Sequence, residues 1–326
     1  MHLPPPDIQK IASQVLAALS GRTCMVGSIN ADLTVETAQL PGPGQTVTGG
    51  PLQILPGGKS ANQAVTASKL GAPTDFIGAI GTDPYAAMLE KSLQDAGVNT
   101  QFLLHRDGPS GTAIITVDNA GENSIVISPG ANGMLTPADI ELAHSAIAKA
   151  ETLGLCLEVA TETVIRAAQI ARAADTLVVF NFSPIKPVPP ELISLIDVLI
   201  VNEHELATLA DFPPEKVTAA RTDTVTTALK EIGVPQAVVT LGAAGSLIYD
   251  DAELHHILPF PVATVDTTGA GDSFMGTLLA ALATDFSLRD GAVLASCVSA
   301  LSTTKLGAQN SYPTRSEVQE YLIGLR

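Results

Sequence analysis

Apolar positions along the chain follow two alternating patterns. Short apolar runs rich in β-branched residues predict buried strands at 23–29, 74–81, 176–184, 196–202 and 236–250, the last being long enough for two strands. Segments with apolar residues at helical spacing predict helices at 60–70, 84–97, 161–174, 203–210, 271–283 and 290–304. Strands alternating with helices predict an α/β fold: a three-layer sandwich with a mostly parallel central sheet covered on both faces.

Two segments interrupt this alternation. Residues 31–50 are polar, turn-rich and prone to β-structure, and residues 111–130 read as a hairpin turning at Asp118–Gly121. We expect the segments at about 31–53 and 110–128 to pair as a small sheet that projects from the main domain as a lid. Such a lid would cover a ligand bound at the ends of the parallel strands.

The N-terminus carries apolar residues at helical spacing, at Ile8, Ile11, Val15, Leu16 and Leu19. We therefore divide the chain into a helical extension, 1–20, and one domain, 21–326. Polar residues interrupt the extension and it lacks a basic leader, so a signal peptide is disfavoured. No apolar run reaches the length of a membrane span.

Composition and charge narrow the possible partners. Hydrophobic residues make up 46% of the 326-residue chain and charged residues 15%, which is typical of a globular protein. The net charge of −16 opposes binding to nucleic acid or to anionic membranes. It also opposes binding of ATP, so a phosphate site would depend on local backbone dipoles and a cation.

Cysteine and histidine usage argues against a disulfide scaffold or a zinc site. Cys24, Cys156 and Cys297 lie far apart in apolar runs without a CxxC pair, which predicts reduced, buried thiols in a cytoplasmic protein. His255 and His256 are adjacent, and neighbours on a strand point to opposite faces, so they form a poor chelate.

Two familiar nucleotide-binding patterns fail at one residue each. In LPGGKSANQAV, residues 55–65, Lys59 and Ser60 match the second half of a P-loop, but Gln53 stands where its first glycine belongs. The pattern GxGxxG beginning at Gly269 fails because position 274 is Phe274. Another role is therefore needed for the lysine.

The strongest chemical signal is VDTTGAGDSFMGTLLAAL, residues 265–282. We expect a strand ending at Asp266, a glycine-rich loop, and a helix from about Gly271. The unpaired N–H groups of a helix start can bind phosphate, so Gly269, Ala270 and Gly271 would form an anion hole. Asp272 could then accept a proton from a hydroxyl that attacks phosphorus. Alternatively, Asp272 could simply stabilise the start of the helix. The combination of a preceding strand, two glycines and a helix rich in small residues argues against that interpretation.

Three segments together resemble the ribokinase family of sugar kinases. They are DTTGAGDSF, GGKSANQAV and GSINADL (27–33), and the likeness runs from about Cys24 to the C-terminus. The resemblance implies a ribokinase-like fold and an ATP-dependent kinase that phosphorylates the primary 5-hydroxyl of ribose, with Mg²⁺ and K⁺ as cofactors and a homodimer formed through the lid. Kinases for deoxyribose, a ketose or a nucleoside stay open, as does a non-catalytic sugar-binding sensor.

The resemblance also implies a role for individual residues. Sugar binding would fall to Asn30, Asp32, Gly58, Lys59, Asn62, Glu158 and Asp272. ATP binding would fall to Asn202, Glu205, Thr240, Gly242, Gly245, Gly271 and Ser296, the first two organising Mg²⁺ through water. Potassium would be held by Asp266, Thr268, Ser302, Lys305, Gly307 and Ser311, the middle ones through carbonyl oxygens.

Some of these residues have plainer interpretations. Asn202 and Glu205 could be an ordinary helix cap, and Glu158, taken alone, an acid at the end of a strand over 152–158. Ser60 departs from the family, which has glycine there. We expect the added hydroxyl to lie beside the sugar pocket and therefore to influence which sugar the protein accepts.

Overall fold

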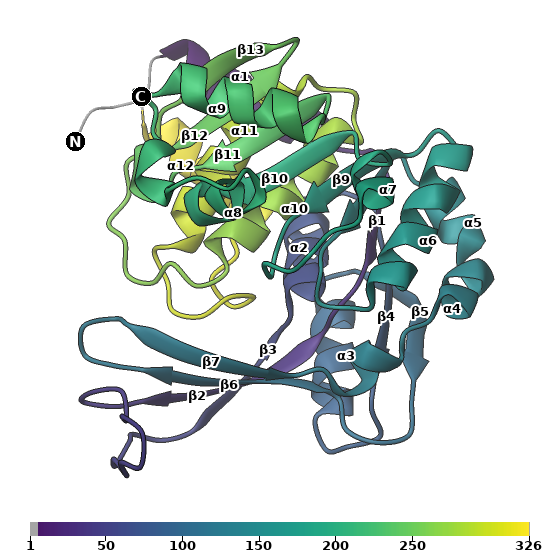
Figure 1. Ribbon diagram of the computed structural model, residues 1–326, viewed down its shortest axis with the longest axis vertical. Helices are drawn as coiled ribbons and strands as arrows, with labels where there is room; N and C mark the ends of the chain where they lie inside the picture. Colours follow the sequence, from purple (N-terminus) through teal and green to yellow (C-terminus); the bar gives the residue numbers. More distant parts are fainter. Residues whose placement is uncertain (1–5, 326) are drawn as a thin grey trace.

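The computed structural model describes residues 6–325, which form a nine-stranded sheet between two helical layers and a separate four-stranded sheet (Figure 1). The strand order in the large sheet is β13-β12-β11-β10-β9-β8-β1-β4-β5. Their bounds are β1 Thr23–Val26, β4 Thr74–Ile80, β5 Asn99–His105, β8 Thr152–Leu155, β9 Leu177–Asn181, β10 Val198–Asn202, β11 Gln236–Thr240, β12 Ser246–Asp250 and β13 Glu253–Ile257. Only β12 runs opposite to the other strands of this sheet, pairing antiparallel with β11 and β13, so the mostly parallel α/β prediction is confirmed.

Helices bury both faces of this sheet. One layer contains α1 Pro6–Ala18, α2 Lys59–Lys69, α3 Ala86–Asp95, α10 Ala270–Leu282, α11 Leu288–Ser302 and α12 Arg315–Gly324. The other contains α4 Pro137–Leu142, α5 His144–Ala148, α6 Thr161–Ala173, α7 Pro190–Ile193, α8 Glu203–Leu209 and α9 Thr222–Ile232. Short 3₁₀ turns lie at Gly130–Met134, Pro214–Lys216 and Gly242–Ala244.

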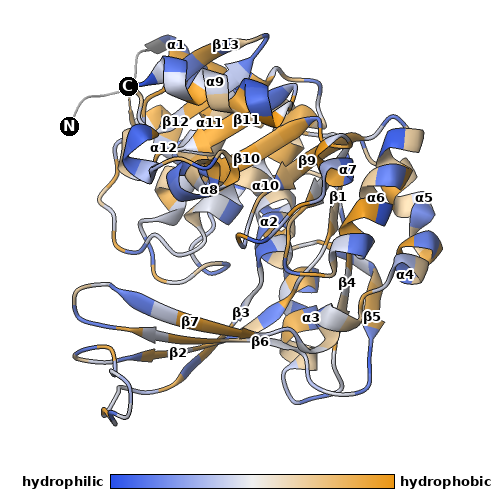
Figure 2. Ribbon diagram, viewed as in Figure 1, coloured by the Kyte–Doolittle hydropathy of each residue, from blue (hydrophilic) through white to orange (hydrophobic). Residues whose placement is uncertain are grey.

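Two-sided burial explains the continuous apolar runs of the strands. In β1, Met25 belongs to the core under the first layer, whereas Cys24 and Val26 belong to the core under the second. Neighbouring strand residues point to opposite faces, so a strand covered on both sides is apolar throughout. Figure 2 shows this as hydrophobic colouring along the central strands. All three cysteines are buried free thiols, as expected.

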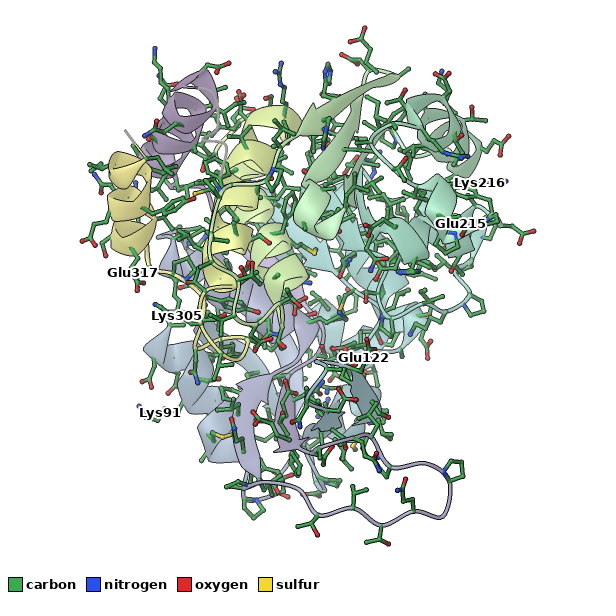
Figure 3. All side chains as sticks on the ribbon, turned by 90° about the vertical axis from the view of Figure 1, so that its left-hand side faces the viewer. Lys91, Glu122, Glu215, Lys216, Lys305 and Glu317 are labelled. Carbon is green, nitrogen blue, oxygen red and sulfur yellow. The ribbon has the colours of Figure 1, made fainter. Side chains whose placement is uncertain are left out.

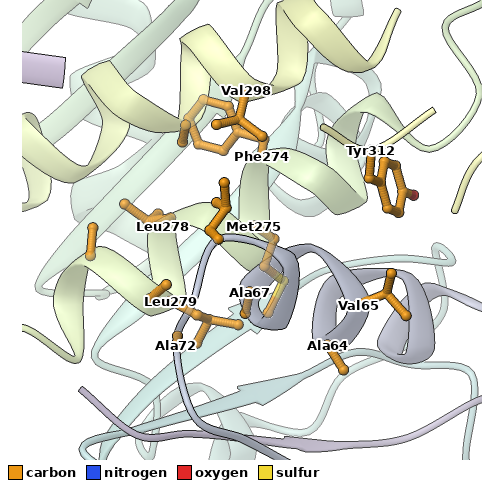
Figure 4. Close-up of a cluster of buried hydrophobic side chains, with 14 of the residues drawn as sticks. Ala64, Val65, Ala67, Ala72, Phe274, Met275, Leu278, Leu279, Val298 and Tyr312 are labelled. Atoms are coloured by element: carbon orange, nitrogen blue, oxygen red, sulfur yellow. The ribbon is translucent and has the colours of Figure 1, made fainter. Parts of the chain in front are cut away.

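Small residues bring helix α2 against helix α10 (Figure 4). Ala67 of α2 lies beside Met275 and Leu279 of α10 within one buried cluster. At Gly276 a Cβ atom would lie 2.3 Å from a backbone oxygen of α2, so any larger residue would force the helices apart. This close packing places the first turn of α2 beside the first turn of α10.

The prediction of a strand that ends at Asp266 is wrong. The last strand, β13, ends at Ile257, and residues 258–266 run without regular structure to helix α10. Pro259 and Pro261 lie in this stretch, and proline has no N–H group to donate to a sheet. The helix itself begins at Ala270, one residue before the predicted start.

The second sheet is the predicted lid. It consists of β2 Asn30–Glu36, β3 Gln53–Gly57, β6 Gly111–Val117 and β7 Asn123–Ser128, in the order β3-β2-β6-β7. It projects from the sandwich in Figure 1. Apolar side chains remain exposed on it, including Ile114, Ile125 and Val126.

The N-terminal helix lies against the C-terminal helices of the domain. Helix α1 packs on α11 and α12, while residues 1–5 of the predicted extension lie outside the described part of the chain. Among residues 6–325, no helix is both long and apolar enough to span a bilayer.

Candidate active site

The carboxyl ends of three parallel strands surround a cavity of about 150 Å³ at the start of helix α10. Asn181 ends β9, Asn202 ends β10 and Thr240 ends β11. The cavity is lined by Lys59, Asn181, Ser183, Ile200, Val201, Asn202, Glu205, Thr240, Thr267 and Gly269–Asp272. The fold thus brings together residues predicted for sugar binding, catalysis and nucleotide binding.

Asp272 lies in the first turn of α10 with only 8% of its surface exposed. Its carboxylate accepts hydrogen bonds from Asn62 Nδ2 at 2.9 Å and from Gln63 Nε2 at 3.3 Å. Burial raises the pKa of Asp272, and nearby Lys59 and the Asn62 hydrogen bond oppose that rise. A buried carboxylate with a raised pKa is a better proton acceptor than an exposed one.

The loop before Asp272 presents backbone N–H groups to the cavity. Gly269 has φ +74°, and a Cβ there would lie 2.3 Å from the Tyr312 hydroxyl, so glycine is required. Among the described hydrogen bonds, the N–H groups of Gly269, Gly271 and Asp272 have no protein acceptor. The N–H of Ala270 already donates to Thr267 O at 3.1 Å. The free amides are therefore those on either side of Ala270.

Lys59 begins helix α2 and faces several acids. Gly58 before it has φ +90°, and a Cβ there would lie 2.7 Å from Ile29 Cα. The Lys59 backbone N–H donates to Glu158 Oε2 at 3.1 Å, and the Ser28 hydroxyl donates to the same oxygen. Burial alone would lower the pKa of Lys59, but Asp272 and Glu158 outweigh it and raise that pKa. Its ammonium therefore stays charged.

Glu158 reaches this position from a turn. Strand β8 ends at Leu155, three residues earlier than the predicted strand, and residues 156–160 carry Glu158 back toward the start of α2. Its carboxylate makes long-range contacts with Ser28 and Lys59. The plain interpretation, an acid at the end of a strand, does not describe it.

Strand β2 of the lid carries Asn30 and Asp32. Neither lines the cavity, but Asp32 lies near Glu158 and Asp272. Asp32 is half-buried, packs against Gly57, and accepts no hydrogen bond among those described for residues 6–325. Burial, with repulsion from Glu158 and Asp272, raises its pKa to about 7. Asn30 is 3% exposed, and its Oδ1 accepts from Asn132 Nδ2 at 2.8 Å. Asp32 thus has an unsatisfied carboxylate available for a ligand's hydroxyl groups.

Sequence reasoning missed three amides that support these residues. Asn132 is 1% exposed and hydrogen-bonds both the N–H and the carbonyl of Ile29, which fixes the start of β2. Gln63 and Gln309 contact the Asp272–Asn62 pair. Gln63 lay inside the quoted motif, but neither its sequence position nor those of the other two indicated these partners.

The prediction that the Ser60 hydroxyl points toward the sugar pocket is wrong. Its side chain is fully buried, and its hydroxyl lies 3.1 Å from Cys156 Sγ and 3.4 Å from Val26 O. A Cβ on Gly27 would lie 2.1 Å from that hydroxyl, so Gly27 provides the space for it. The serine therefore faces the core under β1 and not the sugar pocket.

Asn202 and Glu205 form a complete helix cap at the start of α8. Asn202 Oδ1 accepts from the Glu205 N–H, and Glu205 Oε2 accepts from the Asn202 N–H, both at 2.8 Å. Burial raises the pKa of Glu205, and the Asn202 backbone hydrogen bond and Lys59 oppose that rise. The cap holds both side chains at the cavity wall, so the plain interpretation and a role toward metal-bound water are compatible.

A second cavity, of about 410 Å³, adjoins the first and shares Thr240, Thr267, Ala270 and Gly271 with it. Gly242, Gly245, Phe260, Phe274 and Ser296 also line it. Ser296 is 8% exposed and its hydroxyl has no hydrogen-bond partner among the described residues. The larger, more apolar space fits a base, and the smaller polar one fits phosphates.

The residues predicted to hold potassium lie on two adjoining segments, one before α10 and one at and after the end of α11. Asp266 accepts from the Thr268 N–H and hydroxyl and from the Gly307 N–H, which together lower its pKa against the effect of burial. The Ser302 and Ser311 hydroxyls donate to carbonyls of Ser299 and Ala308.

The end of α11 and the loop after it offer carbonyl oxygens of the kind that a monovalent cation needs. Among the described hydrogen bonds, the carbonyl oxygens of Ser302, Lys305 and Gly307 accept none. The Lys305 ammonium points away to Glu317 at 2.8 Å (Figure 3), so its carbonyl and not its side chain is available. Oxygen donors of this kind fit a potassium ion. Within residues 6–325, no three His, Cys, Asp or Glu side chains are grouped so that they could hold a metal ion.

Comparisons with known proteins agree with this geometry. The sequence profile described as pfkB family carbohydrate kinase matches residues 21–315. Ribokinases from Haemophilus influenzae and Bacillus subtilis are each 35% identical, over 91% and 92% of this chain and 97% and 98% of theirs. A bifunctional ribokinase/ribose-5-phosphate isomerase A from Fructilactobacillus sanfranciscensis is 36% identical over 297 residues, and this chain spans 55% of its length.

Solved structures of ribokinases superpose on this chain. Arabidopsis thaliana ribokinase, complexed with ribose and ATP, superposes with a TM-score of 0.85 at 32% identity, over 93% of this chain and 99% of that one. Thermotoga maritima ribokinase does so with a TM-score of 0.83 at 32% identity, over the same shares. The chain therefore belongs to the pfkB family of carbohydrate kinases, enzymes that transfer a phosphoryl group to an alcohol.

Proposed function

We propose that this kinase transfers the γ-phosphate of ATP to the 5-hydroxyl of ribose, giving ribose 5-phosphate. The observation that carries the proposal is Asp272, a buried carboxylate one residue from the free amide of Gly271 and held by Asn62. The ribose and ATP bound to the Arabidopsis relative support the choice of substrates. A primary hydroxyl placed against this carboxylate would lie beside a phosphate at the helix start.

Polar groups on every side would hold the sugar. Asp32 and Glu158 accept hydrogen bonds, Asn30 both accepts and donates, and Lys59 donates, which matches the mixed character of sugar hydroxyls. Asn62 has one amide hydrogen left after its bond to Asp272. A site that pairs each hydroxyl rejects analogues that lack one. The lid brings Asn30 and Asp32 to the sugar and excludes water.

Asp272 would take the proton of the attacking hydroxyl, and the free amides of Gly269 and Gly271 would stabilise the phosphoryl group during transfer. Lys59 would keep Asp272 ionised beforehand. Mg²⁺ supplies charge neutralisation on the phosphates, and Asn202 with Glu205 would hold its water shell. K⁺ supplies positive charge beside the amide loop, held by Asp266 and the carbonyls around Gly307.

The larger cavity would take the adenine of ATP. Thr240, Gly242 and Gly245 would lie along its phosphates and ribose, and the unpaired Ser296 hydroxyl would face the base. The lid's exposed apolar side chains support a homodimer formed through that sheet. The buried free thiols support a cytoplasmic location.

A substrate panel tests the proposal. Release of ADP would be followed with ribose, 2-deoxyribose, fructose and adenosine, each in potassium and in sodium. We expect the highest kcat/KM with ribose and a slower rate in sodium. Preference for another sugar would reassign the substrate, tight sugar binding without turnover would indicate a sensor, and equal rates in both salts would remove the potassium site.

A further inference from the structure

Behind Asp272, two buried amide side chains, Asn62 and Gln309, are linked by a hydrogen bond. Asn62 Nδ2 donates to Asp272 Oδ2 at 2.9 Å, and Asn62 Oδ1 accepts from Gln309 Nε2 at 3.1 Å. The exposed fractions are 5% for Asn62 and 6% for Gln309. Among the hydrogen bonds described for residues 6–325, Gln309 is linked to the candidate base only through Asn62.

The hydrogen-bond pattern fixes which way the Asn62 amide points. If that amide were turned over, its oxygen would face the Asp272 carboxylate and its NH₂ would face the NH₂ of Gln309. Both contacts would then be repulsive in a buried setting, where an unmatched polar group is costly. We propose that Gln309 is a positioning residue that holds the Asn62 NH₂ toward Asp272. The proposal rests on Asp272 being the base.

The loop that carries Gln309 is itself anchored. The Lys69 ammonium donates to Gln309 O at 2.8 Å and to Tyr312 O at 3.0 Å. The Tyr312 hydroxyl donates to Gly269 O at 3.2 Å, next to the start of α10. One cation therefore ties the loop to α2, and a tyrosine ties it to the amide loop. Gln309 approaches Asn62 from a fixed backbone, as a positioning role requires.

The expected consequence is electrostatic and has a definite sign. An amide donor stabilises the charged form of Asp272, so losing it should raise the pKa of that carboxyl. The charged or titratable groups around Asp272 on the packed elements are Lys59, Asp32, Glu158, Glu205 and Tyr312. Only Lys59 among these is a cation, so the amides supply much of the remaining support for the carboxylate.

Two variants and a neighbour control test this. Gln309→Met keeps the length of the side chain but cannot donate, and Gln309→Glu places an acceptor opposite Asn62 Oδ1. Asn310→Ala changes the next residue, which is exposed. The titration of Asp272 would be read from its ¹³C carboxyl signal in the free protein, assigned by its loss in Asp272→Asn. Kinetics would use the preferred sugar of the panel.

We expect Gln309→Met to raise the Asp272 pKa and to lower kcat/KM for the sugar about 10-fold, which corresponds to about 1.4 kcal/mol. The acidic limb of the pH–rate profile should move upward with it, and further in Gln309→Glu. Asn310→Ala should change neither. An unchanged Asp272 titration in both Gln309 variants would overturn the proposal, even if activity fell. The titration requires no turnover, so failure of ribose as substrate would not decide this result.

Discussion

Asp32→Asn should make the unliganded protein more stable at alkaline pH while it weakens sugar binding. The Asp32 carboxylate is half-buried, faces Glu158 and Asp272, and has a pKa raised from 3.8 to about 7. Because folding raises this pKa, the native state holds its proton more tightly than the unfolded state does. Its ionisation therefore destabilises the fold increasingly as pH rises from about 4 to about 7.

The size of the effect follows from that pKa difference. At about 1.36 kcal/mol per pKa unit, the full destabilisation above pH 7 is about 4 kcal/mol. At pH 5 it is about 1.6 kcal/mol. Asparagine carries no charge at either pH. The advantage of Asp32→Asn in free energy of unfolding should thus grow by about 2.5 kcal/mol between pH 5 and pH 8.

Urea denaturation of both proteins at pH 5 and pH 8, without sugar or ATP, measures this growth. Glu36→Gln is the matched control, because Glu36 is an exposed acid on the same strand and should change stability by less than about 0.5 kcal/mol at either pH. Calorimetry should show weaker ribose binding by Asp32→Asn, by about 1.5–3 kcal/mol for a lost charged hydrogen bond. If the gain in free energy of unfolding from Asp32→Asn were the same at pH 5 and pH 8, the reasoning would be refuted.

Three further substitutions probe the remaining roles. Asp272→Asn should lower kcat by about 10²–10⁴-fold with little change in KM for ATP, and a wild-type rate would contradict the base assignment. Lys59→Ala should weaken sugar binding in calorimetry and spare ATP; the reverse would restore a P-loop-like role. Gly269→Ala should destabilise the fold by about 1–3 kcal/mol, because of its positive φ and the Tyr312 hydroxyl; an unchanged melting temperature would contradict it.

The sequence predicted the layers of this fold because each layer has its own periodicity. Strands buried on both faces are apolar throughout, and the lid differs because its β7 is exposed along its whole length. The error at Asp266 has a local cause. Val262 to Val265 look like a strand, but the prolines just before them prevent a regular ladder. Periodicity alone could not separate an extended loop from a strand.

The site was only partly predictable, for a different reason. Asp272, Lys59 and Asp32 lie in short motifs whose chemistry is visible locally. Gln309 and Asn62 are 247 positions apart, and no local pattern indicates that they meet. Ser60 shows the same limit, because its direction depends on Gly27 and Cys156 across the core. Motifs identify groups that perform chemistry, whereas the groups that orient them depend on tertiary packing.

Concentrating acids at the site has a consequence for ligand binding. Asp272 and Glu158 lie near Asp32, and the same two acids and Glu205 lie near one cation, Lys59. Sugar hydroxyls would donate to these carboxylates and so relieve part of their repulsion, which is strongest when all are ionised. Ribose should therefore raise the melting temperature more at pH 8 than at pH 5, and Asp32→Asn should reduce that difference. Equal stabilisation at both pH values would mean that the sugar does not contact these acids.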